Sequence, residues 1–198
     1  MSNRVTNILL VGVGGQGILL AAEILSEAVL LAGFDVKKSE IHGMSQRGGS
    51  VVSHVRYGTE VFSPIVPEEE GDILFGFELM ETYRSLPLLR QGGAVVANDL
   101  RIAPPSVLMG QDTYPDGLIE RIKERFPDFL LLDGQRLAGE AGNPRAANTV
   151  LLGAVSRRLD IDEQFWLQAL EKMAPKKAQE VNKTAFLLGR SYDWNTPL

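Results

Sequence analysis

The stretch that decides the fold is NILLVGVGGQG, residues 7–17. Its first half, Asn7–Val11, is an apolar run without alternation, which is typical of a strand buried on both faces of a mainly parallel sheet. Its second half has the glycine spacing G-x-G-x-x-G, which indicates a tight turn between a strand and a helix. This segment, the glycine turn, comprises Gly12, Gly14, Gly15, Gln16 and Gly17.

The rest of the chain continues the alternation of strands and helices. Apolar runs predict strands over residues 34–39, 51–57, 61–62, 73–77, 94–97 and 129–132. Helical patterns predict helices over residues 15–32, 79–90, 116–126, 143–158, 162–173 and from Pro175 onward. The alternation favours an α/β fold with a three-layer, doubly wound, mainly parallel sheet. An antiparallel hairpin over residues 51–62 would make that sheet mixed.

The carboxyl-terminal third differs from the rest because no strand signal follows Leu132. We therefore expect one domain over residues 1–198, with an α/β core over 4–142 and a helical segment over 143–192. Within the core, the pair Pro104-Pro105 predicts a stretch without helix, because proline removes a backbone donor and restricts the residue before it.

Length and charge limit the class of protein. The chain has 198 residues and a formal net charge of -5, which speaks against binding to nucleic acid. The longest apolar run, residues 18–31, is interrupted by Glu23, Ser26 and Glu27 and is too short and too polar to cross a bilayer. The first residues show no signal peptide, so we expect a cytoplasmic protein without a membrane anchor.

The sequence contains no cysteine and only two histidines, His42 and His54. Without cysteine the chain offers no disulfide, no thiol nucleophile and no thiolate ligands for zinc or an iron–sulfur cluster of the usual type. Two histidines exclude a three-histidine metal site. We therefore expect that this chain alone holds no metal and no redox cofactor.

The glycine turn by itself allows two interpretations. Free amide groups at a helix start attract anions, and Glu40 follows Gly17 at the spacing of a ribose-binding acid, which together suggest NAD or FAD. Alternatively, the glycines only allow the first helix to pack closely on the sheet, and Glu40 is an ordinary solvated carboxylate.

A second glycine-bearing segment, residues 40–50, lies in a region of positive charge. This basic loop and its flanks contain Lys37, Lys38, Arg47 and Arg56 against the single acid Glu40. Such a loop can approach an anion with its backbone and hold it with a guanidinium group. The alternative is a surface loop that is solvated by its charges.

We consider His42 and Arg47 the candidate catalytic residues of this loop. Arg47 suits a carboxylate or phosphate, and His42 suits proton transfer near neutral pH. His54 and Arg56 share a strand face and are expected to be mainly structural. Further candidates for substrate or cofactor binding in the loop are Ser45, Gln46, Gly48 and Gly49.

Read together, these segments resemble a known family. The glycine turn, EIHGMSQRGG (residues 40–49), Ser53–Arg56 and Ser63-Pro64 are similar to the gamma-type subunit of 2-oxoacid:ferredoxin oxidoreductases. The similarity spans roughly residues 4–190. Within the family, the sequence of the basic loop is most similar to that of the small (beta) subunits of the indolepyruvate branch.

The resemblance implies a division of labour. Family members decarboxylate a 2-oxoacid on thiamine diphosphate with Mg, pass electrons through iron–sulfur clusters to ferredoxin, and transfer the acyl group to coenzyme A. It implies that a large partner subunit holds thiamine diphosphate and the clusters, while this chain completes the active site and is inactive alone. Ferredoxin would then be an indirect partner, and the isolated chain could form a homodimer.

Two other functions remain open from the residues. One is a free-standing oxidoreductase that binds NAD(P) or FAD, based on the glycine turn and Glu40. The other is a non-catalytic module that binds a nucleotide or an acyl-CoA.

Overall fold

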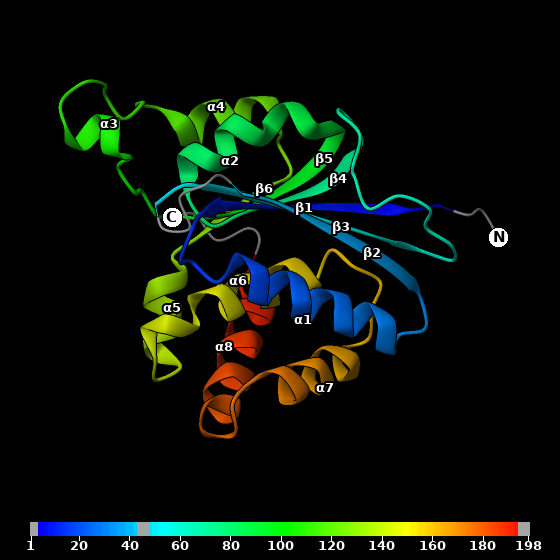
Figure 1. Cartoon of the computed structure of the whole chain (residues 1–198). Coiled ribbons are helices and arrows are strands. Elements are labelled where there is room, and N and C mark those ends of the chain that lie inside the picture. The colour runs from blue at the N-terminus through cyan, green and yellow to red at the C-terminus, as the bar shows by residue number, and fades with distance from the viewer. Residues whose placement is uncertain (1–3, 43–47, 194–198) are drawn as a thin grey trace.

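The computed structural model describes residues 4–42 and 48–193, and Figure 1 shows a sheet between two layers of helices. The sheet has six strands in the order β2-β3-β1-β4-β5-β6. The strands are β1 (Thr6–Val13), β2 (Asp35–His42), β3 (Ser50–Gly58), β4 (Gly71–Gly76), β5 (Leu89–Asn98) and β6 (Phe129–Leu132). The prediction of a three-layer α/β fold with a mixed, mainly parallel sheet is therefore confirmed.

The antiparallel element of the sheet is β3, which lies between β1 and β2 and pairs antiparallel with both. The other neighbouring pairs, β1 with β4, β4 with β5 and β5 with β6, are parallel. The expected hairpin over residues 51–62 is wrong, because residues 61–62 form no strand. β2 does run parallel to β1 as a βαβ unit requires, but β3 is inserted between them.

The helices cover both faces of the sheet, as Figure 1 shows. On one face lie α1 (Ile18–Leu31), α5 (Gly134–Glu140), α6 (Ala147–Ser156), α7 (Glu163–Met173) and α8 (Gln179–Ser191). On the other lie α2 (Leu79–Ser85), α3 (Pro105–Leu108) and α4 (Leu118–Arg125). Short 3-10 turns, η1 (Leu86–Leu88), η2 (Pro144–Ala146) and η3 (Lys176–Ala178), connect these elements.

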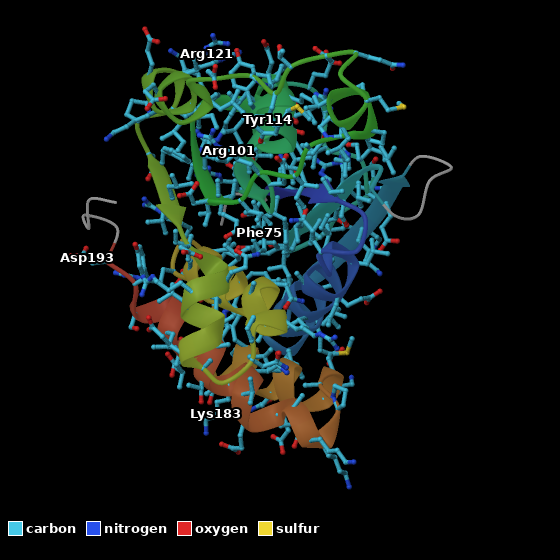
Figure 2. The ribbon with its side chains drawn as sticks, turned by 90° about the vertical axis from the view of Figure 1, so that its left-hand side faces the viewer. Phe75, Arg101, Tyr114, Arg121, Lys183 and Asp193 are labelled. Atoms are coloured by element: carbon cyan, nitrogen blue, oxygen red, sulfur yellow. The ribbon has the colours of Figure 1, made fainter. Side chains whose placement is uncertain are left out.

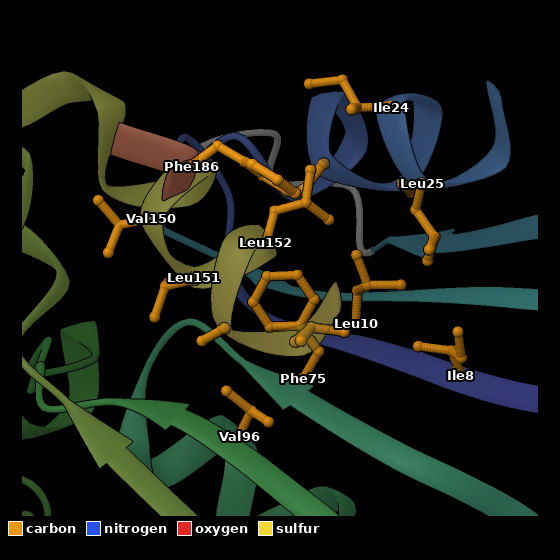
Figure 3. Packing of buried hydrophobic residues seen from close by; sticks show 14 of the residues in the cluster. Ile8, Leu10, Ile24, Leu25, Phe75, Val96, Val150, Leu151, Leu152 and Phe186 are labelled. Carbon is orange, nitrogen blue, oxygen red and sulfur yellow. The ribbon is translucent and has the colours of Figure 1, made fainter. Parts of the chain in front are cut away.

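Two apolar clusters follow from the alternation of side chains along the strands. On β1, Ile8 and Leu10 face the cluster beneath α1 and α6, whereas Leu9 and Val11 face the cluster beneath α2 and α4. Figure 3 shows Leu10, Phe75, Val96, Leu151, Leu152 and Phe186 in the larger cluster. The carboxyl-terminal helices therefore share one core with the sheet.

Several elements differ from the sequence-based expectation. The helix expected to reach residue 90 ends at Ser85, and β5 begins at Leu89. A short helix, α3, forms at Pro105, because proline is tolerated at the first helical position, where its missing N–H would have no partner. No residue pattern indicated α5, since it is only seven residues long and contains two glycines.

A very close approach between helices occurs where α6 crosses α8. A Cβ atom built on Gly153 would lie 2.0 Å from the carbonyl oxygen of Phe186, and one on Gly189 would lie 1.8 Å from that of Val150. Real Cβ atoms do not approach backbone so closely, so each helix needs a glycine at the crossing.

Gly153→Ala is therefore expected to lower the free energy of unfolding by about 3 kcal/mol or more, because the methyl group meets backbone that cannot move without separating the helices. Gly139→Ala in α5 is the matched control, since a Cβ atom at that position would have nothing within 4 Å. That control should gain about 0.5–1 kcal/mol from helix propensity. Urea unfolding followed by circular dichroism measures both, and equal effects would contradict the packing argument.

Candidate functional site

The glycine turn connects the carboxyl end of β1 to the start of α1. Gly12 has no room for a side chain, because a Cβ would lie 2.6 Å from Oε1 of Gln16 and 2.8 Å from Cβ of Phe77. Gly15 and Gly17 adopt φ angles of +103° and +80°, which favour glycine. These two positive φ angles delay the start of the helix to Ile18, three residues later than the sequence pattern suggests.

Gln16 has a structural role that the sequence did not indicate. Its Oε1 accepts a hydrogen bond from the Val13 amide at 2.6 Å, and its Nε2 donates to the Phe77 carbonyl at 2.9 Å. Asn98, at the end of β5, donates to the same carbonyl at 3.3 Å and accepts from the Gly134 amide at 2.9 Å. Side-chain amides thus tie together the carboxyl ends of β1, β4 and β5.

The glycine turn and the end of the basic loop are in contact. The Gly14 amide donates to the Gly49 carbonyl at 2.8 Å, and the Gly48 amide donates to the Gly14 carbonyl at 3.4 Å. The Ser50 hydroxyl donates to Glu81 of α2 at 2.6 Å. Two motifs that are about 30 residues apart in the sequence therefore meet at one edge of the sheet.

The other candidates of the basic loop lie outside what the structure describes. Residues 43–47, which include Ser45, Gln46 and Arg47, fall between the described ranges 4–42 and 48–193. His42 is the last residue of β2, so its backbone is placed at the same edge of the sheet, but its side chain is outside the described part. The proposed roles of these residues stay predictions.

At the same edge of the sheet, the helices that follow neighbouring strands begin to cover opposite faces. α1 follows β1 on one face and α2 follows β4 on the other, and a crevice at such a switch point is the usual ligand site of open α/β sheets. Two hollows flank Gly15. One is an apolar cleft of about 550 Å³ beside Leu19, Leu20 and Val51. The other, of about 360 Å³, lies against Gln16, Phe77, Asn98, Gln135, Arg145 and Asn148.

The second hollow, which we call the switch crevice, contains residues that the sequence did not indicate. Asn98 had a weak signal, because it directly follows an apolar strand. Gln135, Arg145 and Asn148 had none, since polar residues on short helices usually face solvent. Only the packing of α5 and α6 against the sheet brings them to Gly15.

One wall of the switch crevice is fixed by a buried carboxylate. Glu78 is fully buried, caps α2 through the Glu81 amide, and accepts hydrogen bonds from the Ile102 amide at 3.1 Å and the Tyr114 hydroxyl at 2.5 Å. Burial, together with Glu78, raises the pKa of Tyr114 above its ordinary value, so the hydroxyl keeps its proton. Figure 2 shows Arg101 near Tyr114 in this layer, with its guanidinium 5.9 Å from the ring centre.

The geometry does not support Glu40 as a ribose-binding acid. In a dinucleotide fold that acid ends the strand next to β1. Here β3 lies between β1 and β2, and Glu40 instead lies 3.7 Å from Lys38. The main argument for a free-standing NAD or FAD enzyme is therefore lost.

His54 and Arg56 both contact the loop after β3. His54 is buried, and its Nδ1 accepts a hydrogen bond from the Val66 amide at 3.1 Å. Arg56 donates to Asn7 and to the carbonyl oxygens of Ser63 and Ile65. These contacts give both residues a structural role.

The described residues offer neither a metal site nor a helix that could span a membrane. Within residues 4–42 and 48–193, no group of three or more histidine, aspartate or glutamate side chains is arranged to hold a metal ion. Among the same residues, no helix has the length and apolar character that crossing a bilayer requires.

The chain is similar to a known protein family and to several of its named members. Residues 7–192 match the family described as pyruvate ferredoxin/flavodoxin oxidoreductase. Indolepyruvate oxidoreductase subunit IorB of Thermococcus kodakarensis is 42% identical over 188 residues, which cover 92% of this chain and 93% of that protein. The subunit of the same name from Pyrococcus horikoshii is 43% identical over 190 residues, again 92% and 93% of the two chains.

Solved structures share the fold. The gamma subunit of a keto/oxoacid ferredoxin oxidoreductase from Geobacter sulfurreducens has a TM-score of 0.67 at 23% identity and covers 93% of this chain and 95% of its own. Pyruvate oxidoreductase subunit PORC of Thermotoga maritima has a TM-score of 0.70 at 21% identity, with 94% and 95% covered.

Gln16→Met is expected to lower the free energy of unfolding by about 1–3 kcal/mol, because the Val13 amide and the Phe77 carbonyl both lose their partner while the side-chain volume is kept. Gln168→Met on the exposed side of α7 is the control and should change stability by less than about 0.5 kcal/mol. Chemical denaturation compares the two, and a Gln16 variant as stable as its control would refute the bridging role.

Stability is expected to fall as the pH drops below about 6.5, the ordinary pKa of histidine. Burial, with a smaller contribution from Arg56, lowers the pKa of His54 in the folded state. The unfolded chain therefore binds the proton first, and the stabilisation present above pH 6.5 is lost as the pH falls toward the lowered pKa.

Denaturation at pH 7.5 and 5.5 tests this for wild type and His54→Asn, in which the Asn oxygen replaces Nδ1 as acceptor for Val66. The difference between the two pH values should shrink in His54→Asn and persist in His42→Asn. The opposite pattern would assign the pH dependence to the other histidine.

Proposed function

We propose that this chain, which belongs to the pyruvate ferredoxin/flavodoxin oxidoreductase family, is the small subunit of an indolepyruvate oxidoreductase. It is a subunit of a 2-oxoacid:ferredoxin oxidoreductase and therefore works within a larger complex. The observation that carries the proposed substrate is the similarity to the IorB subunits of Thermococcus kodakarensis and Pyrococcus horikoshii over more than nine-tenths of both chains. The gamma subunits named for pyruvate and ketoisovalerate are less similar, at 27% identity in Thermococcus litoralis.

The proposed division of labour follows from the residues of this chain. Because it has no cysteine, it supplies no thiolate to an iron–sulfur cluster. We assign the clusters, thiamine diphosphate and its Mg to a large partner subunit, from which ferredoxin takes the electrons. Coenzyme A would enter as the acyl acceptor of the complex.

The site that we propose for this chain is the edge where the glycine turn meets the basic loop. The hydrogen bonds between Gly14 and Gly48–Gly49 support this, because they hold both motifs at one surface. His42 and Arg47 are the proposed catalytic residues there, with Ser45 and Gln46 as further contacts. The exposed side chains of Leu19 and Leu20 beside the turn suit the boundary with another subunit.

Activity is expected only from the complex. The isolated chain should not reduce ferredoxin or a dye on addition of indolepyruvate and coenzyme A, whereas the chain co-expressed with the large subunit should. Arg47→Ala in the assembled complex should lower the rate about tenfold to a hundredfold, since a charge-assisted hydrogen bond contributes about 1.5–3 kcal/mol.

Arg121→Ala is the matched control, because Arg121 is an exposed arginine on α4, in the opposite layer from α1. Its complex should keep the full rate. Size-exclusion chromatography checks that both variants assemble. Turnover by the isolated chain, or a substrate panel in which pyruvate outpaces indolepyruvate, would overturn the corresponding part of the proposal.

A further inference from the structure

The outer side of β2, which we call the β2 edge, has no partner strand among the described residues. β2 is the first strand in the sheet order, so only β3 pairs with it there. The strand has eight residues, Asp35–His42, and none of residues 35–41 is buried. β6, at the opposite edge, has only four residues. A long edge strand is a template for another strand, because half of its backbone N–H and C=O groups face outward.

The lysines of β2 do not guard this edge as free charges. Lysine on an edge strand usually discourages pairing with another chain. Here Nζ of Lys37 lies 2.6 Å from Asp35, and Lys38 forms ion pairs with Glu23 of α1 and with Glu40. The strand therefore presents a balanced pattern of charge, which can match a strand of complementary pattern.

Three exposed apolar side chains follow β2 on the face of the sheet that α2 covers. Ile41 lies directly opposite Val52 of β3, which packs against the cluster beneath α2 and α4, and opposite residues share a face. The loop after β3 returns along the same face, since the Val61 amide donates to Asp35 at 2.8 Å and Val66 belongs to the same cluster. The exposed members, which we call the apolar row, are Ile41, Phe62 and Ile65, at 54%, 84% and 44% exposure.

A second copy of this chain can pair with the β2 edge only in certain registers. Two copies joined by a two-fold axis form an antiparallel pair in which the residue on the axis meets itself. Like charges directly opposite each other are destabilising, which excludes the four charged residues of β2 from the axis. Of the other positions, Ser39 is nearest the middle of the strand and therefore allows the longest pairing, over residues 36–42.

With Ser39 on the axis, the two copies are complementary. Lys38 lies opposite the partner's Glu40, and Glu40 lies opposite the partner's Lys38, so two opposite-charge pairs flank the axis. The apolar row is complementary as well. Phe62 lies at the start of β2, because Val61 is bound to Asp35, and an antiparallel strand brings the partner's Ile41 to that end. Both exposed side chains would then leave water.

We propose that this chain forms a two-fold homodimer through antiparallel pairing of β2 with the partner's β2, centred on Ser39. The two sheets become one continuous sheet, with the apolar row of each copy at the junction. This goes beyond the proposed function, which assigns no role to the β2 edge.

Sedimentation velocity on the full isolated chain tests the homodimer. The wild-type chain should associate to a dimer. Lys38→Glu and Glu40→Lys should each weaken the dimer at least about tenfold, because each places two pairs of like charges across the axis. An equimolar mixture of the two variants should regain the dimer, since the charges of one variant are complementary to those of the other.

Lys123→Glu is the matched control, because Lys123 is an exposed lysine on α4 and its reversal makes the same change of charge away from β2. It should leave the dimer unchanged. Phe62→Ser tests the apolar row separately and should weaken the dimer about tenfold. Far-ultraviolet circular dichroism checks that every variant is folded.

Three results would overturn the proposal. The first is a wild-type chain that stays monomeric at high micromolar concentration, including the case in which the β2 amides gain protection from hydrogen exchange only when the large subunit is added. The second is a dimer that neither charge reversal weakens, since its interface would lie elsewhere. The third is a pair of monomeric variants that do not associate on mixing, which would exclude the register centred on Ser39.

If a charge reversal fails to fold, Phe62→Ser decides, because a ring exposed to this degree contributes little to the fold of one copy. A dimer unaffected by that change would then overturn the proposal. The result is independent of the proposed function, because association is measured on this chain alone and keto acid oxidation on the assembled complex. Either can fail while the other succeeds.

Discussion

The rest of the structure depends on how three strand ends are held together at one edge of the sheet. The absence of a side chain at Gly12 allows the Gln16 amide to bridge the Val13 amide and the Phe77 carbonyl. Asn98 extends the bridge to β5. With the strand ends fixed, α1 and α2 leave toward opposite faces, and the switch crevice lies against the ends of β4 and β5. The glycine turn thus serves mainly to pack the strand ends together. The free amides at the start of α1 are a consequence of that packing.

The alternation of apolar runs was enough to predict the layers, because a strand buried on both faces needs a helix on each side. The glycine turn could be located by the same reasoning, since only glycine adopts its positive φ angles readily. The pairing of β3 with β1 and β2 could not be predicted from the sequence. Its alternating pattern shows one less-buried face but does not tell which strands lie beside it. Neighbours in a sheet are set by long-range contacts that a local pattern does not record.

The residues of the switch crevice show a second limit of the sequence. Asn148 and Arg145 are about 130 residues from Gly15, and each looks like an ordinary polar residue near the start of a helix. They reach the glycine turn because α6 packs against the sheet, and Gly153 and Gly189 let α8 pack on α6 at backbone contact. The contribution of those glycines depends on a distance between helices, and no residue pattern within either helix reveals it.

The charged residues near the carboxyl ends of the strands determine the charge of the switch crevice. The chain is acidic overall, and Asp99 and Asp133 directly follow β5 and β6, but neither lines the switch crevice. Glu78 is buried and fully hydrogen-bonded, and Glu81 is occupied by Ser50 and Arg84. Glu78 and Glu81 thus hold a loop and a helix, and neither lines the crevice. Among the described residues that line the switch crevice, Arg145 is the only charged one, so this hollow carries positive charge in a chain that is acidic overall.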